Sequence, residues 1–225
     1  MHAATIARPD ITYMSNKLSQ YYSDPSMTHL KSAKHLLRYL KGHLNLAVHY
    51  KSSGIPTANI VPVIYADASF ASDNDDNRST SGYVVMLNGG VISFQSQKQK
   101  LTALSSMEAE FIALTEACRE ALFIRKLLRE FNMFPVDAES PIPIKFVTDA
   151  RAVLNNIKNN VHSSRTKHFR IKTNFIRELY ENGEITIEHV ESAEQPADVL
   201  TKPLGPHKHQ HALDLLNLVE LPNVA

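Results

Sequence analysis

The sequence predicts an α/β fold in which a five-stranded mixed β-sheet is flanked by helices. Two observations support this prediction. Three strand-like segments come first, and two of them form a hairpin across Asn88-Gly89-Gly90, a sequence that favours a tight reversal of the chain. Two further strand-like segments then alternate with helical ones, which is the order expected of parallel βα units with helices on both faces of the sheet.

The individual elements follow from the periodicity of apolar residues. These residues alternate or run together in the expected strands and recur every three or four positions in the expected helices. Strands are expected at 61–68, 82–87, 91–96, 142–148 and 185–190, and helices at 105–131, 150–158 and 165–182. A last helix is expected from Ser192-x-x-Gln195, because this spacing has the form of a capping box.

The first 55 residues predict a small helical segment. Helical periodicity runs from Pro9 to Tyr22 and from Met27 to Lys41, and a short strand is expected at 46–50. The stretch Ser52-Ser-Gly-Ile-Pro56 is typical of a linker. We therefore expect three parts: a helical segment at 1–55, the main domain at 56–208 and a C-terminal tail or helix at 209–225.

Composition limits the function without defining it. The chain has 225 residues, 43% of them hydrophobic, which is enough for a substantial core. The net charge is +1, but residues 1–60 carry seven Lys/Arg against two acids, a local excess of +5. A basic arm beside an acidic centre suits a polyanion, although each charge alone is typical of a solvated surface.

Cysteine content and hydropathy exclude other classes. The single cysteine, Cys118, excludes an internal disulfide and a multi-cysteine zinc site. No apolar run approaches the length of a membrane span, and the N-terminus lacks a signal-peptide pattern. We therefore expect a soluble, intracellular protein.

Four acidic residues lie at or near the ends of expected elements: Asp67, Glu110, Asp149 and Asp198. A strand end holds a carboxylate on a rigid element, and carboxylates without Cys or His suit Mg²⁺. For Asp67 or Asp149 taken alone, a helix cap or a strand-end turn is the better explanation. The four together indicate a metal site.

Spacing favours Glu110 over Glu108 within the helix that contains MEAEF. Glu110 lies at helical steps from Met107, Leu114 and Ala117, so it belongs to the apolar face. An acid on that face requires a partner, which a metal supplies, whereas Glu108 is expected on a solvated face. The acids of the polar loop are expected to anchor that loop: Asp73, Asp75 and Asp76.

Six motifs carry a family resemblance. In order they are YADASF, DNDDNRSTSGYVV, SFQSQKQ, ALSSMEAEFIALTEA, SSRTKHFRIK and QPADVLTKPL. Together they resemble the ribonuclease H domain of copia-type LTR retrotransposon polyproteins. Residues 8–42 resemble the segment that precedes this domain, at the end of the reverse transcriptase connection region. The resemblance implies a ribonuclease H-like fold after a small helical connection segment, and the absence of the polymerase's paired aspartates implies that this chain does not copy nucleic acid.

The resemblance also implies an activity. This is hydrolysis of the RNA strand of an RNA/DNA hybrid during reverse transcription, with two Mg²⁺ ions, or Mn²⁺ in their place. Two such ions activate a water and stabilise the leaving oxygen. The implied catalytic and metal-binding residues are Asp67, Glu110, Asp149 and Asp198. The implied partners are the hybrid and the polymerase domain of the same polyprotein, without a membrane, in cytoplasmic virus-like particles or the nucleus.

Basic residues are candidates for contact with phosphates, which would make binding sensitive to salt. They are Lys98, Lys100, Arg165, Lys167, His168 and Arg170. The alternative for each is an ordinary basic surface. The competing function for the chain is a catalytically inactive retroelement fragment that binds nucleic acid without cleavage. A third hypothesis keeps the fold but assigns a different reaction to it, since related sheets occur in integrases and other nucleases.

Overall fold

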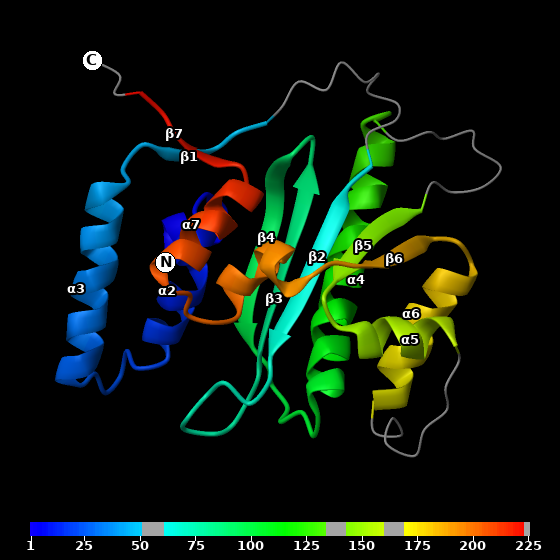
Figure 1. Cartoon of the computed structure of the whole chain (residues 1–225), viewed down its shortest axis with the longest axis horizontal. Coiled ribbons are helices and arrows are strands. Elements are labelled where there is room, and N and C mark those ends of the chain that lie inside the picture. Colours follow the sequence, from blue (N-terminus) through cyan, green and yellow to red (C-terminus); the bar gives the residue numbers. More distant parts are fainter. Residues whose placement is uncertain (51–60, 134–142, 160–168, 223–225) are drawn as a thin grey trace.

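The computed structural model describes residues 1–50, 61–133, 143–159 and 169–222 (Figure 1). Its centre is a sheet with the strand order β4-β3-β2-β5-β6. Strands β2, β3 and β4 pair antiparallel, and β2, β5 and β6 pair parallel. The predicted five-stranded mixed sheet is therefore confirmed, with β2 in the middle. The strands are β2 (Val63–Ser69), β3 (Thr80–Leu87), β4 (Gly90–Lys98), β5 (Ile144–Thr148) and β6 (Ile185–His189).

One face of the sheet is covered by three helices, α4 (Ser106–Glu130), α5 (Arg151–Lys158) and α6 (Arg170–Glu181). Helix α4 begins where the Ser105 hydroxyl accepts a hydrogen bond from the Glu108 backbone N–H at 3.1 Å, a common N-cap arrangement. It continues without a break and buries side chains along its length, including Phe111 and Leu128. This layer holds the larger of two hydrophobic cores.

The opposite face is covered by C-terminal elements: the short helix η5 (Pro196–Leu200) and α7 (Pro206–Leu215). Gly82 in β3 permits this close packing. A Cβ at that position would lie 2.7 Å from Thr201 Cγ2 and 2.8 Å from Leu200 Cβ, closer than carbon atoms approach. The glycine in the STSGYVV motif therefore lets η5 lie directly on the central strands.

The prediction of a helix that begins at Ser192 is wrong. The structure has two short 3₁₀ helices instead, η4 (Ser192–Glu194) and η5. Gln195, which is almost fully buried, does not close a capping box; its side-chain Nε2 donates to the Ala66 carbonyl oxygen at 3.1 Å. The Gln195 side-chain oxygen accepts from the Ala197 backbone N–H at 3.4 Å, so Gln195 caps η5 and contacts the central strand at the same time.

The N-terminal elements are α1 (His2–Ile6), η1 (Pro9–Ile11), α2 (Thr12–Ser19) and α3 (Met27–Gly42). Helix α2 packs against β4, and α1, η1 and α3 contact α2. The helix expected at 9–22 is thus split into η1 and α2. Strand β1 (Leu46–Val48) pairs antiparallel with β7 (Leu218–Glu220), so the segment after α3 and the C-terminal segment form a second small sheet (Figure 1).

The division at 1–55, 56–208 and 209–225 stays a prediction, since the linker lies outside the described residues. The strand β7 and its pairing with β1 were not predicted. Among the helices that the structure describes, none combines the length and the hydropathy needed to cross a membrane.

Candidate active site at the centre of the sheet

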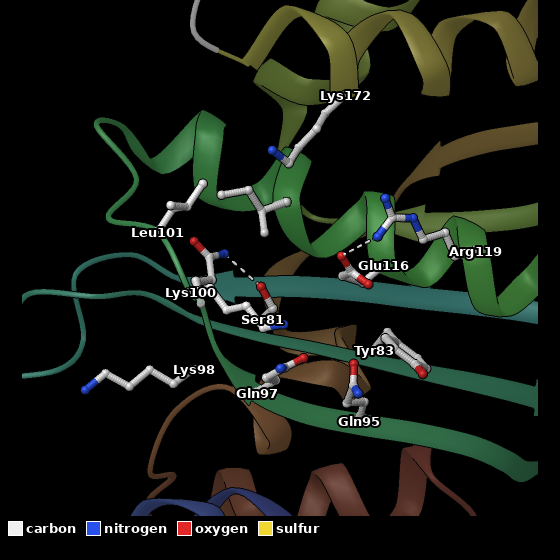
Figure 2. Close-up of a pocket in the computed structure, with 12 residues that line it drawn as sticks. Ser81, Tyr83, Gln95, Gln97, Lys98, Lys100, Leu101, Glu116, Arg119 and Lys172 are labelled. Carbon is white, nitrogen blue, oxygen red and sulfur yellow. Dashed lines mark hydrogen bonds and ion pairs between the residues drawn. The ribbon is translucent and has the colours of Figure 1, made fainter. Parts of the chain in front are cut away.

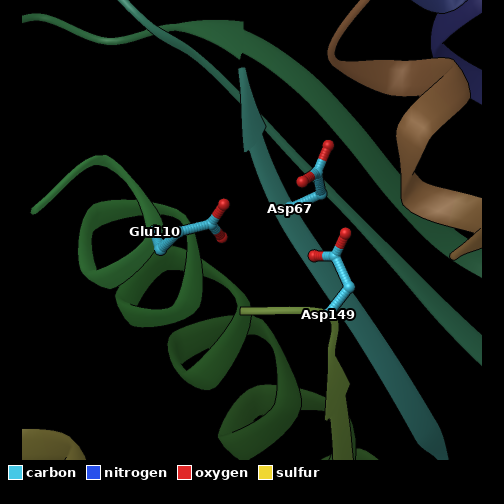
Figure 3. Close-up of side chains that lie close together, drawn as sticks. All are labelled: Asp67, Glu110 and Asp149. Atoms are coloured by element: carbon cyan, nitrogen blue, oxygen red, sulfur yellow. The ribbon is translucent and has the colours of Figure 1, made fainter. Parts of the chain in front are cut away.

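Three of the four predicted acids meet at one point of the sheet. Strand β2 supplies Asp67, α4 supplies Glu110, and Asp149 directly follows β5. One carboxylate oxygen from each lies within 4.8 Å of the others, and Figure 3 shows the side chains converging from these three elements.

The pairing of the strands explains how two of these acids meet. Tyr65 of β2 pairs with Val147 of β5 in parallel register. Two residues further along both strands, Asp67 and Asp149 therefore lie side by side. Glu110 approaches from the second turn of α4, where its carboxylate accepts a hydrogen bond from the Ala68 backbone N–H. The site thus depends on strand register and on helix packing together.

Neighbouring hydroxyl groups orient two of the carboxylates. The Thr201 hydroxyl donates to Asp67 Oδ2 through a short hydrogen bond, and the Ser192 hydroxyl donates to Asp149 Oδ2 at 2.6 Å. Asp67 is only 3% exposed. Its orientation is therefore fixed by buried contacts, which is what a preorganised ligand site requires.

Burial and mutual repulsion perturb these acids. Burial, together with the charges of Asp67 and Asp149, raises the pKa of Glu110 to about 9. The pKa of Asp67 is raised as well, chiefly by burial, although Lys202 opposes this shift. Such shifts show that negative charge is unfavourable in this cluster unless a cation compensates for it.

The fourth acid, Asp198, lies next to the cluster but outside it. Asp198 follows Pro196 and Ala197 in η5, and its Oδ1 is 2.7 Å from Lys202 Nζ. The same ammonium group is 3.8 Å from Asp67 Oδ2. A lysine therefore stands between the two carboxylates, in the place where the prediction expected a shared metal.

The donor set fits a hard divalent cation. Three carboxylates from three separate elements offer oxygen atoms to one point, and Mg²⁺ prefers oxygen ligands with room for water. The cluster holds no sulfur or imidazole, which zinc sites commonly use. The roles of Asp67, Glu110, Asp149 and Asp198 as ligands stay a prediction.

Glu108 is better explained by the start of α4 than by a solvated face. Its carboxylate accepts a hydrogen bond from the Leu104 backbone N–H at 2.8 Å, so it satisfies a donor before the first turn. Asp73 has the anchoring role expected of it: it is buried and forms ion pairs with Lys17 at 2.6 Å and Lys98 at 3.0 Å. Neither acid belongs to the group of carboxylates formed by Asp67, Glu110 and Asp149.

The basic candidates fall into three groups. Arg165, Lys167 and His168 lie outside the described residues. Lys98 is engaged by Asp73 and Asp76, which leaves its ammonium less free to meet a phosphate. Lys100 and Arg170 are exposed.

A polar groove of about 260 Å³ lies between the β3–β4 hairpin, α4 and α6 (Figure 2). Lys100 and Lys172 line it together with Gln95 and Gln97. Arg119 also lines it and pairs with Glu116 at 3.0 Å. The groove thus combines cationic and amide groups, which are common partners of phosphates.

Several residues around the acids were missed from the sequence: Ser192, Gln195, Thr201 and Lys202. Gln195, Thr201 and Lys202 belong to the motif QPADVLTK, so the motif pointed to this segment, but nothing in the spacing shows which acid each side chain would contact. Lys202 lies four residues after Asp198. Two side chains at this spacing are expected to approach each other only where the chain turns as a helix does.

The sheet order, the helix α4 across β2 and the acids at the ends of β2 and β5 define a ribonuclease H-like domain. No protein-family profile matches the chain. Its relatives are retrovirus-related Pol polyproteins of transposons. It is 30% identical over 220 residues to that of transposon TNT 1-94 of Nicotiana tabacum, and 35% identical over 215 residues to that of RE1 of Arabidopsis thaliana.

Over most of its length the chain is thus similar to copia-type retrotransposon Pol polyproteins. The matches cover 97% and 96% of the chain but only 16% and 14% of the TNT 1-94 and RE1 polyproteins. A shorter relative, the secreted RxLR effector protein 161 of Plasmopara viticola, is 42% identical over 124 residues, which are 55% of this chain and 84% of that protein.

Solved structures of similar shape include ribonuclease H1 from Halobacterium salinarum. It is 20% identical, covers 68% of this chain and 97% of its own, and has a TM-score of 0.44. The fold assignment rests on the strand order and helix placement described above rather than on this score.

Proposed function

We propose that this chain is a metal-dependent ribonuclease H, which hydrolyses the RNA strand of RNA/DNA hybrids during retrotransposon reverse transcription. The observation that most strongly supports the proposal is the position of three acids at the centre of a ribonuclease H-like sheet. One carboxylate oxygen each of Asp67, Glu110 and Asp149 lies within 4.8 Å of the others. The relatives add support, since they are Pol polyproteins of retrotransposons.

The four acids would hold two Mg²⁺ ions, with Mn²⁺ able to replace them. Bound there, the two ions would activate a water and stabilise the leaving oxygen of the scissile phosphate. We assign Asp67 the role of shared ligand, because its carboxylate is close to those of Glu110 and Asp149 and is 3.8 Å from Lys202, which pairs with Asp198. Thr201 and Ser192 would keep the carboxylate oxygens of Asp67 and Asp149 aimed at the metals.

Two basic surfaces would hold the substrate. The groove lined by Lys100 and Lys172 is one. The other is a concave surface of about 870 Å³ that begins at Asp198 and Lys202 and continues over His207 and Lys208 of α7. Backbone contacts of this kind add affinity without reading sequence. Arg170 is proposed as a further phosphate contact, and Lys98 as a weaker one because of its ion pairs.

The partner proposed for the chain is the polymerase domain of the same polyprotein, since the chain spans about one-sixth or less of the relatives above. Reverse transcription would then supply the hybrid that this domain cuts. We propose that the activity occurs inside the cell, in cytoplasmic virus-like particles or in the nucleus, without a membrane partner.

The experiment is cleavage of an RNA/DNA hybrid labelled on the RNA strand, with Mg²⁺ or Mn²⁺ and with EDTA. Asp67→Asn is compared with Asp24→Asn, which makes the same change at an exposed acid between α2 and α3. We expect Asp67→Asn to lower the cleavage rate more than about 100-fold, since it removes a ligand charge from the metal site. Asp24→Asn should leave it unchanged.

Substrate controls separate this activity from other nucleases. RNA/RNA and DNA/DNA duplexes should remain intact, because a ribonuclease H needs an RNA strand opposite DNA. If the folded chain binds the hybrid but never cuts it with either metal, the inactive binding fragment is the correct reading. Cutting that survives both EDTA and Asp67→Asn would exclude the proposed site.

A further inference from the structure

Lys202 is the feature that the proposed metal site does not explain. Its Nζ lies 2.7 Å from Asp198 Oδ1 and 3.8 Å from Asp67 Oδ2. Lys202 is therefore paired with two acids that were expected to bind metal. Its ammonium group lies between Asp198 and the three-acid cluster.

The backbone at Lys202 is fixed, whereas its side chain is not enclosed. Thr201 is fully buried and its hydroxyl hydrogen-bonds both the Asp67 carboxylate and the Asp198 backbone carbonyl. The Lys202 backbone N–H donates to the same carbonyl at 3.2 Å. The Lys202 side chain, in contrast, is 37% exposed. The ammonium group can therefore leave the acids for solvent while the motif around it stays in place.

The surroundings of the acids explain why a cation is favoured here. Asp67 is 3% exposed and lies beside the carboxyl groups of Glu110 and Asp149, so a negative charge on it is poorly solvated. A nearby positive charge offsets this cost, and the interaction is stronger where water is partly excluded. Lys202 supplies that charge through a flexible four-carbon chain.

We propose that Lys202 acts as a tethered competing cation at the candidate metal site. In the metal-free protein its ammonium group neutralises Asp67 and holds Asp198 outside the cluster of Asp67, Glu110 and Asp149. A divalent ion that uses Asp198 must displace this ammonium group. The inference rests on the proposed function, because it concerns the metals of that same site.

Two consequences follow from competition. The affinity of the site for a divalent ion is lower than it would be if the four acids were present without Lys202. The reason is that the ion pairs of Lys202 must be broken before the ion binds. Loss of the metal is correspondingly easier, because the ammonium group can return to Asp198 and Asp67. Lys202 is thus a positioning residue for Asp198 and a determinant of metal affinity.

The test is titration of the full chain with Mn²⁺ and with Mg²⁺ by calorimetry, in the absence of nucleic acid. Lys202→Met removes the charge but keeps a side chain of similar length. We expect it to bind Mn²⁺ about fivefold or more tightly, an effect of the size expected for one nearby charge at a partly exposed site. Lys202→Arg keeps the charge and should stay within about twofold of the original affinity.

Lys126→Met is the matched control, since Lys126 is an exposed lysine on α4 and should leave the affinity unchanged. Melting temperature gives a second readout. Without metal, Lys202→Met should melt lower than the original chain, and Mn²⁺ should raise its melting temperature by more. A lysine with a purely structural role would lower the melting temperature without tightening metal binding.

The inference is overturned if Lys202→Met binds Mn²⁺ with equal or weaker affinity while the original chain binds it. That result would leave the proposed function intact. If the original chain binds neither metal, the proposed function fails and this inference fails with it. Should Lys202→Met not fold, Lys202→Gln provides the same test with a polar side chain of the same neutral charge.

Discussion

Helices α3 and α4 are the longest helices that the structure describes, and the fold uses them in opposite ways. Helix α4 buries ten of its side chains, whereas α3 buries none. Leu30 and Leu37 of α3 remain exposed although the helix is amphipathic. The difference shows that an apolar stripe in the sequence predicts a helix but does not by itself predict what the helix packs against.

The two helices are also held by different forces. Helix α4 lies in a hydrophobic core that includes Phe111 and the sheet beneath it. Helix α3 is attached largely through polar contacts, among them the Tyr39 hydroxyl, which donates to Asp10 Oδ2 at 2.9 Å. Asp10 in turn forms a buried ion pair with Arg8 at 2.7 Å. We therefore expect substitutions in the α4 layer to cost far more stability than those in α3.

The largest effect is expected in the α4 core. Phe111 is fully buried, and its ring centroid lies 5.3 Å from that of Phe169. Phe111→Ala should lower the free energy of unfolding by about 3–5 kcal/mol, through lost burial and the cavity left behind. Chemical denaturation measures this. Phe123→Ala, on the same helix but 60% exposed, is the control and should cost less than about 1 kcal/mol.

A smaller loss is expected where the N-terminal segment meets the loop after β2. Asp73 is buried, but its lysine partners, Lys17 and Lys98, are partly exposed. Asp73→Asn should therefore lower the free energy of unfolding by about 1–2 kcal/mol. Denaturation at neutral pH measures the difference. An unchanged stability would mean that this junction contributes little.

The same residue predicts a dependence on pH. Burial alone would raise the pKa of Asp73, but hydrogen bonds from Lys17, the Asp75 backbone N–H and Lys98 hold it below its usual range. A lowered pKa means that the stabilisation is complete above the ordinary value near about 4 and is lost as the pH falls below it. The difference between the original chain and Asp73→Asn should therefore shrink between about pH 4 and pH 2.

An effect of opposite sign is expected at the candidate site. The pKa of Glu110 is raised to about 9, so between about pH 4 and pH 9 the folded chain keeps a proton that the unfolded chain loses. Metal-free stability therefore falls as the pH rises through this range. Glu110→Gln should raise the free energy of unfolding at pH 7 by about 1 kcal/mol, while it weakens Mn²⁺ binding. Glu130→Gln, at the exposed end of α4, should do neither.

The smallest effect is expected on α3. Leu37 is 64% exposed, so Leu37→Ala should change the free energy of unfolding by no more than about 0.5 kcal/mol. Leu114→Ala on α4, where the leucine is 2% exposed, should cost about 2–5 kcal/mol. Equal losses at the two positions would contradict the contrast between the helices.

Most of the sheet and the acid cluster could be predicted because their signals are local. Alternating apolar residues predicted strand β2, and the turn sequence Asn88-Gly89 predicted the hairpin of β3 and β4. The apolar face of MEAEF selected Glu110 over Glu108. Each of these depends on residues within one or two turns of the chain, whose spacing is fixed by backbone geometry.

The failures occurred where distant contacts replaced local ones. Ser192-x-x-Gln195 has the spacing of a capping box, yet Gln195 bonds to Ala66, which lies 129 positions away. Strand β7 is only three residues long and exists because β1 pairs with it. Such choices depend on which surfaces become buried together, and that information is not present in any short window.

The sequence by itself determined the order of strands and helices, the placement of four acids at or near the ends of elements, and the family resemblance of six motifs. Only the tertiary structure decided that Lys202 stands between Asp198 and Asp67, and that α3 leaves Leu30 and Leu37 exposed. The physical reason is that secondary structure follows from side-chain periodicity along the chain, whereas charge pairing and burial depend on the packing of segments far apart in sequence.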